Sequence, residues 1–178
     1  MKSACSEQTE QIHTLGDIPR IYAAARPDAI ATKFEGRTTT YSSLEAHTNK
    51  IANALLGADV KSGERIGYLG KNSDFYFELM FGAAKMGAIT LPIGWRLAAV
   101  EIAHILKDGE VSLLFLSVEF ADLAKEAIKH SGRSVRVIEL ESPAEEGFAA
   151  WRDAHSADDP GVKVSPSDVV MQLYTSGT

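Results

Sequence analysis

The sequence predicts an α/β fold: a mostly parallel sheet with helices on both faces and a small β-hairpin near the start. Short apolar runs of strand type alternate with segments of helical periodicity about 10–15 residues long, which is typical of βαβ units. The run 113–116 is continuously apolar, as expected for a strand buried on both faces. The 178 residues are 45% hydrophobic and 24% charged, a composition that excludes collagen, coiled coils, low-complexity disorder and disulfide scaffolds.

The first elements are a helix and a hairpin. Residues 1–14 are polar and predicted to be disordered, and they include the single Cys5, which we interpret as a free thiol of a reducing compartment. A short helix over 15–25 ends before a proline. Two strand-type runs, 29–34 and 38–41, flank a loop that contains glycine, so they predict a hairpin.

A long helix is predicted after the hairpin. Ser42 and Glu45 have the spacing of a capping box, and apolar residues recur at helical spacing until Gly57 ends the helix. A strand over 65–69 follows.

The segment 73–86 is apolar over most of its circumference and predicts a largely buried helix that Gly87 ends. Its aromatic residues Phe75, Phe77 and Phe81 could form the wall of a binding pocket for an apolar ligand, but their helical spacing favours plain core packing.

The next elements alternate regularly. A short strand over 88–91 is expected to end at Pro92. The pattern then predicts a helix over 100–106, the strand 113–116, an amphipathic helix over 120–128 and a strand over 135–140.

The last elements are another helix and another strand. Ser142, Pro143 and Glu145 occupy preferred N-cap and first-turn positions, so a helix is expected there with Phe148 and Trp151 facing inward. The apolar run 169–174 predicts a final strand.

The final strand runs directly into Thr175, Ser176, Gly177 and Thr178. Hydroxyl groups and backbone amides around a glycine suit an oxyanion, since glycine lets the backbone approach closely. Taken on composition alone, however, an ordinary solvated turn is the favoured interpretation. The run matches neither the Walker phosphate loop nor the nucleophile elbow.

Other features point to few further activities. The net charge of −6 argues against nucleic acid as the main partner. The start lacks the apolar core of a signal peptide and no run is long enough to span a membrane, so a cytoplasmic protein is expected. The five histidines lack metal-ligand spacing, and the glutamates near the predicted helix start at Ser142 suit helix capping better than catalysis.

Several motifs together resemble the adenylate-forming enzymes, which include acyl-CoA synthetases, luciferases and peptide-synthetase adenylation domains. The run from Tyr174 to Thr178 resembles the opening of their phosphate-binding signature, Tyr-Thr-Ser-Gly-Thr-Thr-Gly-x-Pro-Lys-Gly. Further matches follow in the family's order, although Gly94 stands where an asparagine is usual. They are Thr40-Tyr41-Ser42-Ser43-Leu44, Gly63-Glu64-Arg65-Ile66-Gly67, Ala84-Lys85-Met86-Gly87-Ala88, Pro92-Ile93 with Arg96-Leu97, and Ser167-Asp168-Val169.

The resemblance implies that residues 15–178 are an incomplete N-terminal AMP-binding domain. It further implies that Thr175, Ser176, Gly177 and Thr178 hold the phosphates of ATP, that Thr175 reaches Mg²⁺, and that no catalytic residue lies in this chain. The full-length protein would join a carboxylic acid to CoA, and a fatty or aromatic acid is the favoured substrate. The 178 residues alone would be inactive. A non-catalytic binding or dimerisation module derived from such a domain is the alternative, and a homodimer stays open.

Overall fold

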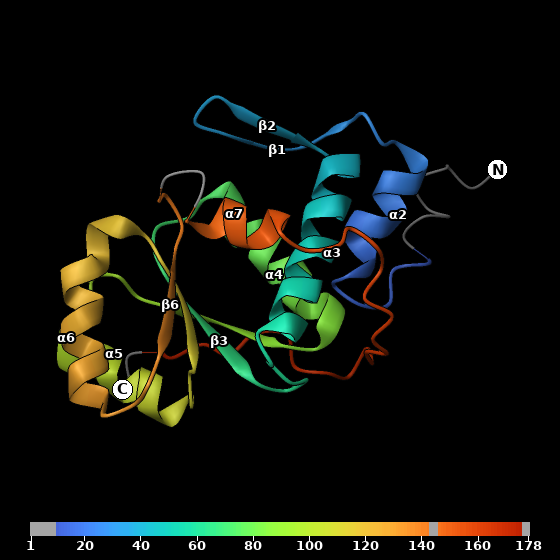
Figure 1. Cartoon of the computed structure of the whole chain (residues 1–178). Coiled ribbons are helices and arrows are strands. Elements are labelled where there is room, and N and C mark those ends of the chain that lie inside the picture. The colour runs from blue at the N-terminus through green and yellow to red at the C-terminus, as the bar shows by residue number, and fades with distance from the viewer. Residues whose placement is uncertain (1–9, 143–145, 176–178) are drawn as a thin grey trace.

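The computed structural model describes residues 10–142 and 146–175. Its centre is a four-stranded parallel sheet in the order β4-β3-β5-β6, and a separate antiparallel pair, β1-β2, lies beside it (Figure 1). This arrangement confirms the predicted fold class. The strands are β1 (Ile30–Phe34), β2 (Arg37–Thr40), β3 (Arg65–Leu69), β4 (Ile89–Ile93), β5 (Leu113–Leu116) and β6 (Arg136–Glu139).

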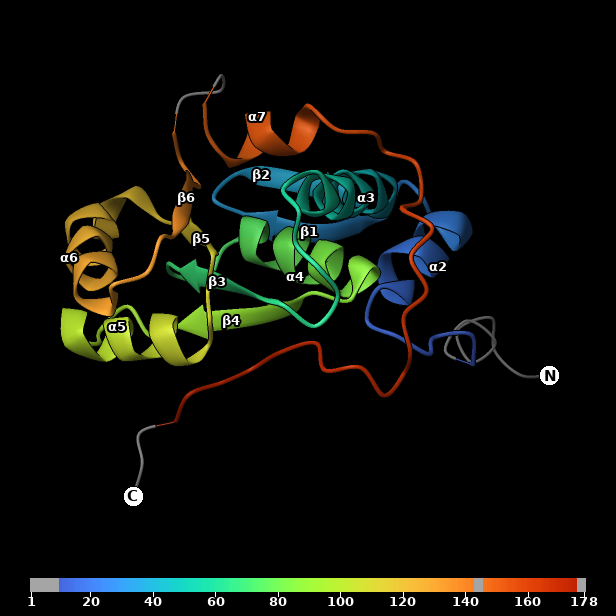
Figure 2. The same cartoon turned by 60° about the horizontal axis from the view of Figure 1, so that its bottom comes forward.

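Helices cover both faces of the parallel sheet, because alternate strand residues point to opposite sides. Ile66 and Phe115 belong to a core cluster shared with α3 (Tyr41–Gly57), α4 (Asp74–Met86) and α7 (Phe148–Asp153). Leu114 and Leu116 belong to a second cluster with α5 (Ala99–Asp108) and α6 (Ala121–Ser131), which lie on the other side (Figure 2).

Two shorter helical elements complete the fold. α2 (Asp17–Ala25) packs against α3, and the single 3₁₀ turn η1 (Val118–Phe120) leads into α6. None of the helices within the described ranges is long and apolar enough to cross a membrane.

The predicted hairpin is present and is tied to α4. Glu35 and Gly36 form its turn with φ angles of 45° and 82°, the left-handed pair that matches the twist of two antiparallel strands. Arg37, the first residue of β2, donates two hydrogen bonds to the carboxylate of Asp74, at 2.7 and 2.8 Å. Burial raises the pKa of Asp74, but the hydrogen bonds and charge of Arg37 together with backbone hydrogen bonds outweigh it, so the pKa is lowered and the pair stays charged.

Two predicted helix starts are wrong in detail. α3 begins at Tyr41, and the side chain of Thr40, not Ser42, caps it by accepting from the amide of Ser43 at 3.2 Å. Glu45 instead accepts a 2.6 Å hydrogen bond from the buried Lys85 of α4.

The last helix also starts later than expected. α7 begins at Phe148 with Gly147 as its N-cap, and Ser142 hydrogen-bonds Glu139 instead of capping a helix. Pro143 and Glu145, which the prediction also used, lie outside the described residues. Phe148 and Trp151 do face the core, as predicted.

Pro92 lies inside β4, not after its end, and the alternation of backbone amides explains why. The amide of Ile89 bonds Glu64 on the β3 side, whereas the amide of Thr90 bonds Val170 on the other side. The nitrogen of Pro92 shares the side of Thr90, away from β3. Pro92 therefore costs the sheet no hydrogen bond to β3.

The close approach of α3 and α4 depends on Gly82. A Cβ atom at this position would lie 2.6 Å from Cγ2 of Ile51 and 3.0 Å from the carbonyl oxygen of Thr48. The helix backbones could not keep their separation if any side chain were present.

We expect Gly82→Ala to lower the free energy of unfolding by about 1–2 kcal/mol, since overpacking by about 1–3 kcal/mol outweighs a gain in helix propensity of at most about 1 kcal/mol. Urea denaturation of the chain measures the change. Gly57→Ala is the control, because Gly57 is exposed at the end of α3 and its new Cβ would meet only the ring of His155 at 3.2 Å. A Gly82→Ala variant as stable as Gly57→Ala would contradict the close-packing argument.

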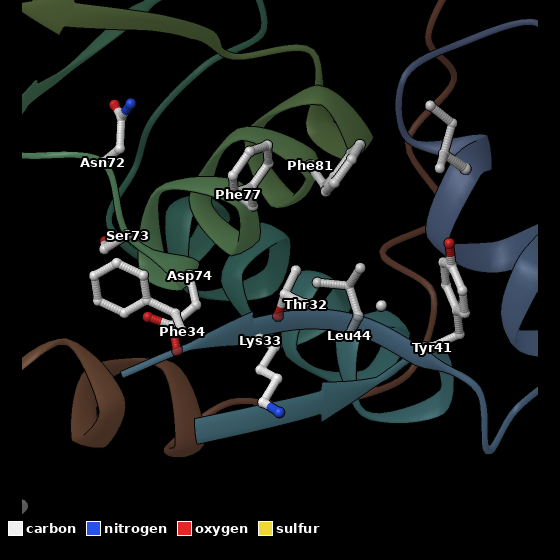
Figure 3. A pocket seen from close by; sticks show the side chains of 12 residues that line it. Thr32, Lys33, Phe34, Tyr41, Leu44, Asn72, Ser73, Asp74, Phe77 and Phe81 are labelled. Carbon is white, nitrogen blue, oxygen red and sulfur yellow. The ribbon is translucent and has the colours of Figure 1, made fainter. Parts of the chain in front are cut away.

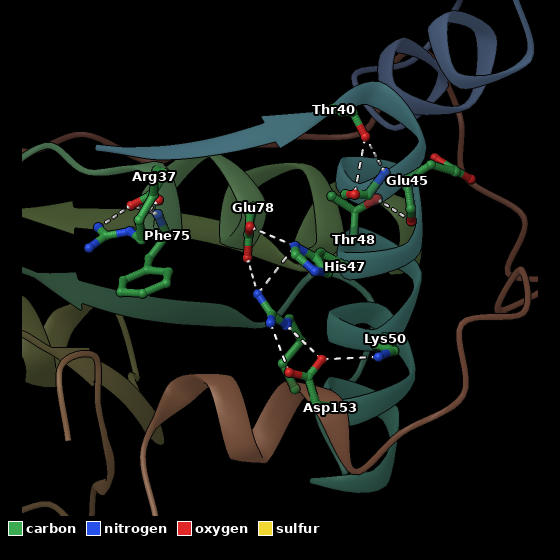
Figure 4. Close-up of polar contacts among 12 residues, drawn as sticks. Arg37, Thr40, Glu45, His47, Thr48, Lys50, Phe75, Glu78 and Asp153 are labelled. Atoms are coloured by element: carbon green, nitrogen blue, oxygen red, sulfur yellow. Dashed lines mark hydrogen bonds and ion pairs between the residues drawn. The ribbon is translucent and has the colours of Figure 1, made fainter. Parts of the chain in front are cut away.

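A buried ionic group joins α7 to α3 and α4 (Figure 4). Arg152 donates from Nη1 to Oε2 of Glu78 at 2.6 Å, and Nδ1 of His47 lies 2.8 Å from Oε1 of Glu78. Glu78 and Arg152 are 3% and 7% exposed, so the charges have little access to water. Asp153 receives hydrogen bonds from Arg152 and Lys50, which lower its pKa to about 2.

Candidate functional site

Ligands of open α/β sheets bind beyond the carboxyl ends of the parallel strands. A hollow of about 370 Å³ lies there, past the ends of β3 and β4. Residues 171 and 173 of the last segment line it together with aromatic side chains from the strand ends and α4. The lining residues are Tyr68, Gly70, Asn72, Tyr76, Pro92, Ile93, Gly94, Trp95, Met171 and Leu173.

The segment that follows α7 runs along the outside of the domain and returns to β4 (Figure 2). Two asparagines of α3, one helical turn apart, hold its beginning. Asn49 donates to the carbonyl of Ala157 at 3.0 Å, and Asn53 donates to the carbonyls of Ser156 and Asp158 at 2.9 Å each. Three successive carbonyl groups are thus fixed by α3.

Lys85 supports this contact from α4. Its ammonium group donates to Oδ1 of Asn49 at 2.5 Å, which leaves the amide nitrogen of Asn49 to hold the segment. Burial lowers the pKa of Lys85, although Glu45 opposes the shift. In the sequence, the only sign of this arrangement is a pair of asparagines four residues apart, which lie on one face of α3.

The predicted final strand over 169–174 is wrong. Only Met171 forms a parallel bridge, with Thr90. Thr90 donates to the carbonyl of Val170 and accepts from the amide of Gln172, both at 3.0 Å. A strand needs successive backbone pairs with a neighbour, and β4 supplies only these two bonds.

After Gln172 the segment leaves the sheet and contacts α5. The hydroxyl group of Tyr174 donates to Asp108, and Thr175 is exposed beside α5. Tyr174 and Thr175 line a pocket of about 440 Å³ with Leu97, Val100, Glu101, His104 and Ile105. Of the predicted phosphate-binding residues, Ser176, Gly177 and Thr178 lie outside the described residues, so only Thr175 has a place in the structure.

A third cavity, a pocket of about 420 Å³, lies between the hairpin and α4 (Figure 3). Phe77 and Phe81 point into it, and Phe77 is 44% exposed. The prediction of plain core packing therefore holds for Phe75, which packs against the core, and is wrong for Phe77.

Trp95 is held at the rim of the 370 Å³ hollow. Its ring stacks on Phe120 with centroids 5.7 Å apart, and Lys71 and Arg96 lie over its ring at 5.5 and 4.9 Å. The loop around Trp95 therefore packs against the domain.

Contacts with neighbouring groups account for His47 and Glu141. Within the two described ranges no group of three or more His, Cys, Asp or Glu could hold a metal ion. His47 contacts Glu78, and Glu141 accepts from Ser117 and from the amide of Val118 at 2.8 and 3.0 Å.

Comparison with known proteins agrees with this geometry. Residues 20–178 match the family model of the AMP-binding enzymes. The chain is 40% identical to a fatty acid–[acyl-carrier-protein] ligase, ScoC, of Streptomyces coeruleorubidus over 169 residues, and 34% identical to a feruloyl-CoA synthase of an Amycolatopsis species over 164 residues. These alignments cover 94% and 92% of the chain but only 31% of each relative.

A solved structure of a Mycobacterium tuberculosis fatty acyl CoA synthetase has the same fold, with a TM-score of 0.80 and 28% identity. The match covers 92% of the chain and 33% of that structure, so the chain spans about a third of the length of its relatives. The match over 20–178 begins in α2 and covers most of the chain, and on this ground the chain belongs to the family of AMP-binding enzymes.

Proposed function

We propose that the chain is the N-terminal part of the AMP-binding domain of an ATP-dependent acyl-CoA ligase. The observation that carries this is the docking of segment 170–175 beside β4, through the two backbone hydrogen bonds of Thr90. This segment ends at Thr175, the first residue of the run that resembles the family's phosphate-binding signature after Tyr174. The relatives support a ligase, since their names describe ligation of a fatty acid to a carrier protein and synthesis of feruloyl-CoA. A fatty or aromatic carboxylic acid is accordingly the proposed substrate.

The proposed reaction has two steps. A carboxylate oxygen of the acid attacks the α-phosphorus of ATP, the bond to the bridging oxygen breaks, and pyrophosphate leaves. The thiol of CoA then attacks the acyl carbon of the adenylate and releases its proton to solvent, and AMP leaves with the electrons of the broken acyl C–O bond. Both partners of the first step are anions, so catalysis requires donors that offset their repulsion and hold the phosphates in line.

The role proposed for this chain is to hold phosphate oxygens. Thr175, Ser176 and Thr178 would donate from their hydroxyl groups, and Gly177 would let the backbone amides approach. The donor set fits this task, because hydroxyls and amides are neutral donors and the described member, Thr175, is exposed to a ligand. The run supplies no acid or base, so the chemistry would rest on positioning.

Mg²⁺ is the metal that the family implies. When bound, it would neutralise part of the phosphate charge. Mg²⁺ at phosphate sites is usually held by one or two protein oxygens, with phosphates and water completing its shell. A single hydroxyl such as that of Thr175 fits this pattern, and we propose it as the contact from this chain.

The test compares the full-length ligase with the 178-residue chain. Pyrophosphate release is measured with ATP, Mg²⁺ and a panel of fatty, aromatic and amino acids. We expect turnover by the full-length protein with fatty or aromatic acids. Pyrophosphate release by the chain alone should not exceed the buffer rate, because its motif carries no lysine or carboxylate to complete a phosphate site.

Turnover by the purified chain would contradict the proposed division of roles. If the full-length protein released no pyrophosphate with any acid, the ligase proposal would be wrong. A stable dimer formed by the chain in that case would favour the alternative of a non-catalytic dimerisation module.

A further inference from the structure

We propose that Tyr174 and Asp108 form an anchor that positions the phosphate-binding segment against α5. This inference rests on the proposed function, because it concerns the same segment. Tyr174 and Asp108 are positioning residues in this proposal, since neither would touch the phosphates.

The hydroxyl group of Tyr174 both donates and accepts a hydrogen bond. The hydroxyl donates to Oδ2 of Asp108 at the end of α5 and accepts from Nε2 of Gln172 at 3.1 Å. The ring meets His104 edge-on, with centroids 6.5 Å apart and planes at 81°. Tyr174 also packs against the core cluster shared by α5 and α6.

The neighbours of Tyr174 contribute no comparable attachment. Leu173 is 64% exposed and Thr175 is exposed as well. Among residues 170–175, the last backbone hydrogen bond to the sheet is that of the Gln172 amide to the carbonyl of Thr90. Between Gln172 and Thr175, the side chain of Tyr174 is therefore the connection between segment and domain.

The anchor is stable in the neutral range because of its charge state. Burial and the neighbouring Asp108 carboxylate raise the pKa of Tyr174, so the phenol stays protonated and keeps donating. An ionised acceptor makes the hydrogen bond stronger than one between neutral groups.

The position of Tyr174 gives the anchor its effect. Because it immediately precedes Thr175, a fixed ring limits how far the following backbone can move. A binding segment that is already ordered loses less conformational entropy when the ligand binds, so less of the binding free energy is spent on ordering it. Loss of the anchor should therefore weaken ATP binding more than it slows the chemical step.

The first experiment measures amide hydrogen exchange in the 178-residue chain. The amide of Gln172 reports docking directly, because it bonds the carbonyl of Thr90. We expect Tyr174→Phe to raise its exchange rate about 5- to 20-fold, the effect of one hydrogen bond to a charged group that is partly open to water. Amides of β3 and β5 should keep their rates. Asp108→Ala should match Tyr174→Phe, and the double variant should exchange no faster than either.

Two matched variants separate positioning from general stability. Thr90→Val removes a buried hydroxyl that finds no hydrogen-bond partner in the described part of the chain, and it keeps both backbone bonds. Its Gln172 amide should exchange as in the parent. Asn53→Ala removes the hydrogen bonds to the carbonyls of Ser156 and Asp158, which lie in the stretch directly after α7 and far from Thr175 in the sequence. It should lower the melting temperature while leaving the KM for ATP unchanged.

The second experiment measures steady-state kinetics of the full-length ligase. Tyr174→Phe should raise the KM for ATP about 5- to 10-fold with kcat within about threefold, as expected for lost pre-ordering. Asp108→Asn, which keeps an acceptor oxygen, should restore most of the loss seen in Asp108→Ala.

Each result has one meaning. An unchanged Gln172 exchange rate in Tyr174→Phe would overturn the anchor itself. Faster exchange with an unchanged KM for ATP would show an anchor that does not position the phosphate segment, and would overturn the inference. Failure of the proposed function would be recognised separately, as absence of ATP-dependent turnover in the unmodified ligase.

Discussion

Glu78→Ala is expected to lower the free energy of unfolding of the chain by about 3–5 kcal/mol, the usual result of removing one partner of a buried ion pair. The variant leaves the guanidinium of Arg152, only 7% exposed, without its 2.6 Å partner on α4. Asp153 still pairs with Arg152 but lies at the outer side, where its carboxylate is 44% exposed. Urea denaturation followed by circular dichroism measures the change.

Two controls test whether the loss of stability comes from leaving a buried charge without its partner. Lys61→Ala breaks an ion pair whose partners are 64% and 87% exposed, and it should leave the free energy of unfolding close to that of the unmodified chain, because water screens exposed charges. The double variant Glu78→Leu, Arg152→Met replaces both charges with apolar groups and should be more stable than Glu78→Ala, since no charge stays buried alone. A Glu78→Ala variant as stable as Lys61→Ala would show that the group contributes little.

Ser176→Ala and Thr178→Ala in the full-length ligase should each lower kcat/KM for ATP in the adenylation half-reaction by roughly 10- to 150-fold. Each change removes a proposed donor to a charged phosphate, and such hydrogen bonds contribute about 1.5–3 kcal/mol, with each 1.36 kcal/mol corresponding to a factor of ten. The melting temperature should stay that of the parent, because neither hydroxyl is expected to support the core.

Thr38→Ala is the matched control for this pair, as Thr38 is exposed on β2, away from the segment. Its kcat/KM should stay within a few-fold of the parent. If Ser176→Ala and Thr178→Ala both kept the parent's kcat/KM, the assignment of the motif to phosphate would be wrong. If both instead lost their thermal transition, the run would be a structural turn.

The sequence predicted the parts of the fold that follow from local periodicity. α5 and α6 each present an apolar stripe to a face of the sheet, and α4 is apolar over most of its circumference. Gly87 ends α4 with a φ of 77°, as a left-handed terminal residue does. The strand 113–116 was identifiable because burial on both faces requires every residue to be apolar.

Features that depend on partners distant in the sequence could not be predicted. Residues 169–174 are as apolar as a strand, but strand formation depends on which backbone lies beside them, and β4 offers only the two bonds of Thr90. Phe77 has the spacing of a core residue, yet nothing in α4 specifies what covers that face. The anchor of Tyr174 required α5 to place Asp108 beside a residue 66 positions away in the sequence.

Because the chain is synthesised from its N-terminus, the bridge between Thr90 and Met171 can form only late in synthesis. Ribosomes add about 5–20 residues each second, so β4 exists for several seconds before its neighbour on that side has been synthesised. During this interval the open edge of β4 could pair with the strands of other nascent chains. Pro92 turns its nitrogen toward that edge and presents no donor there, which makes the waiting strand a poorer template for aggregation.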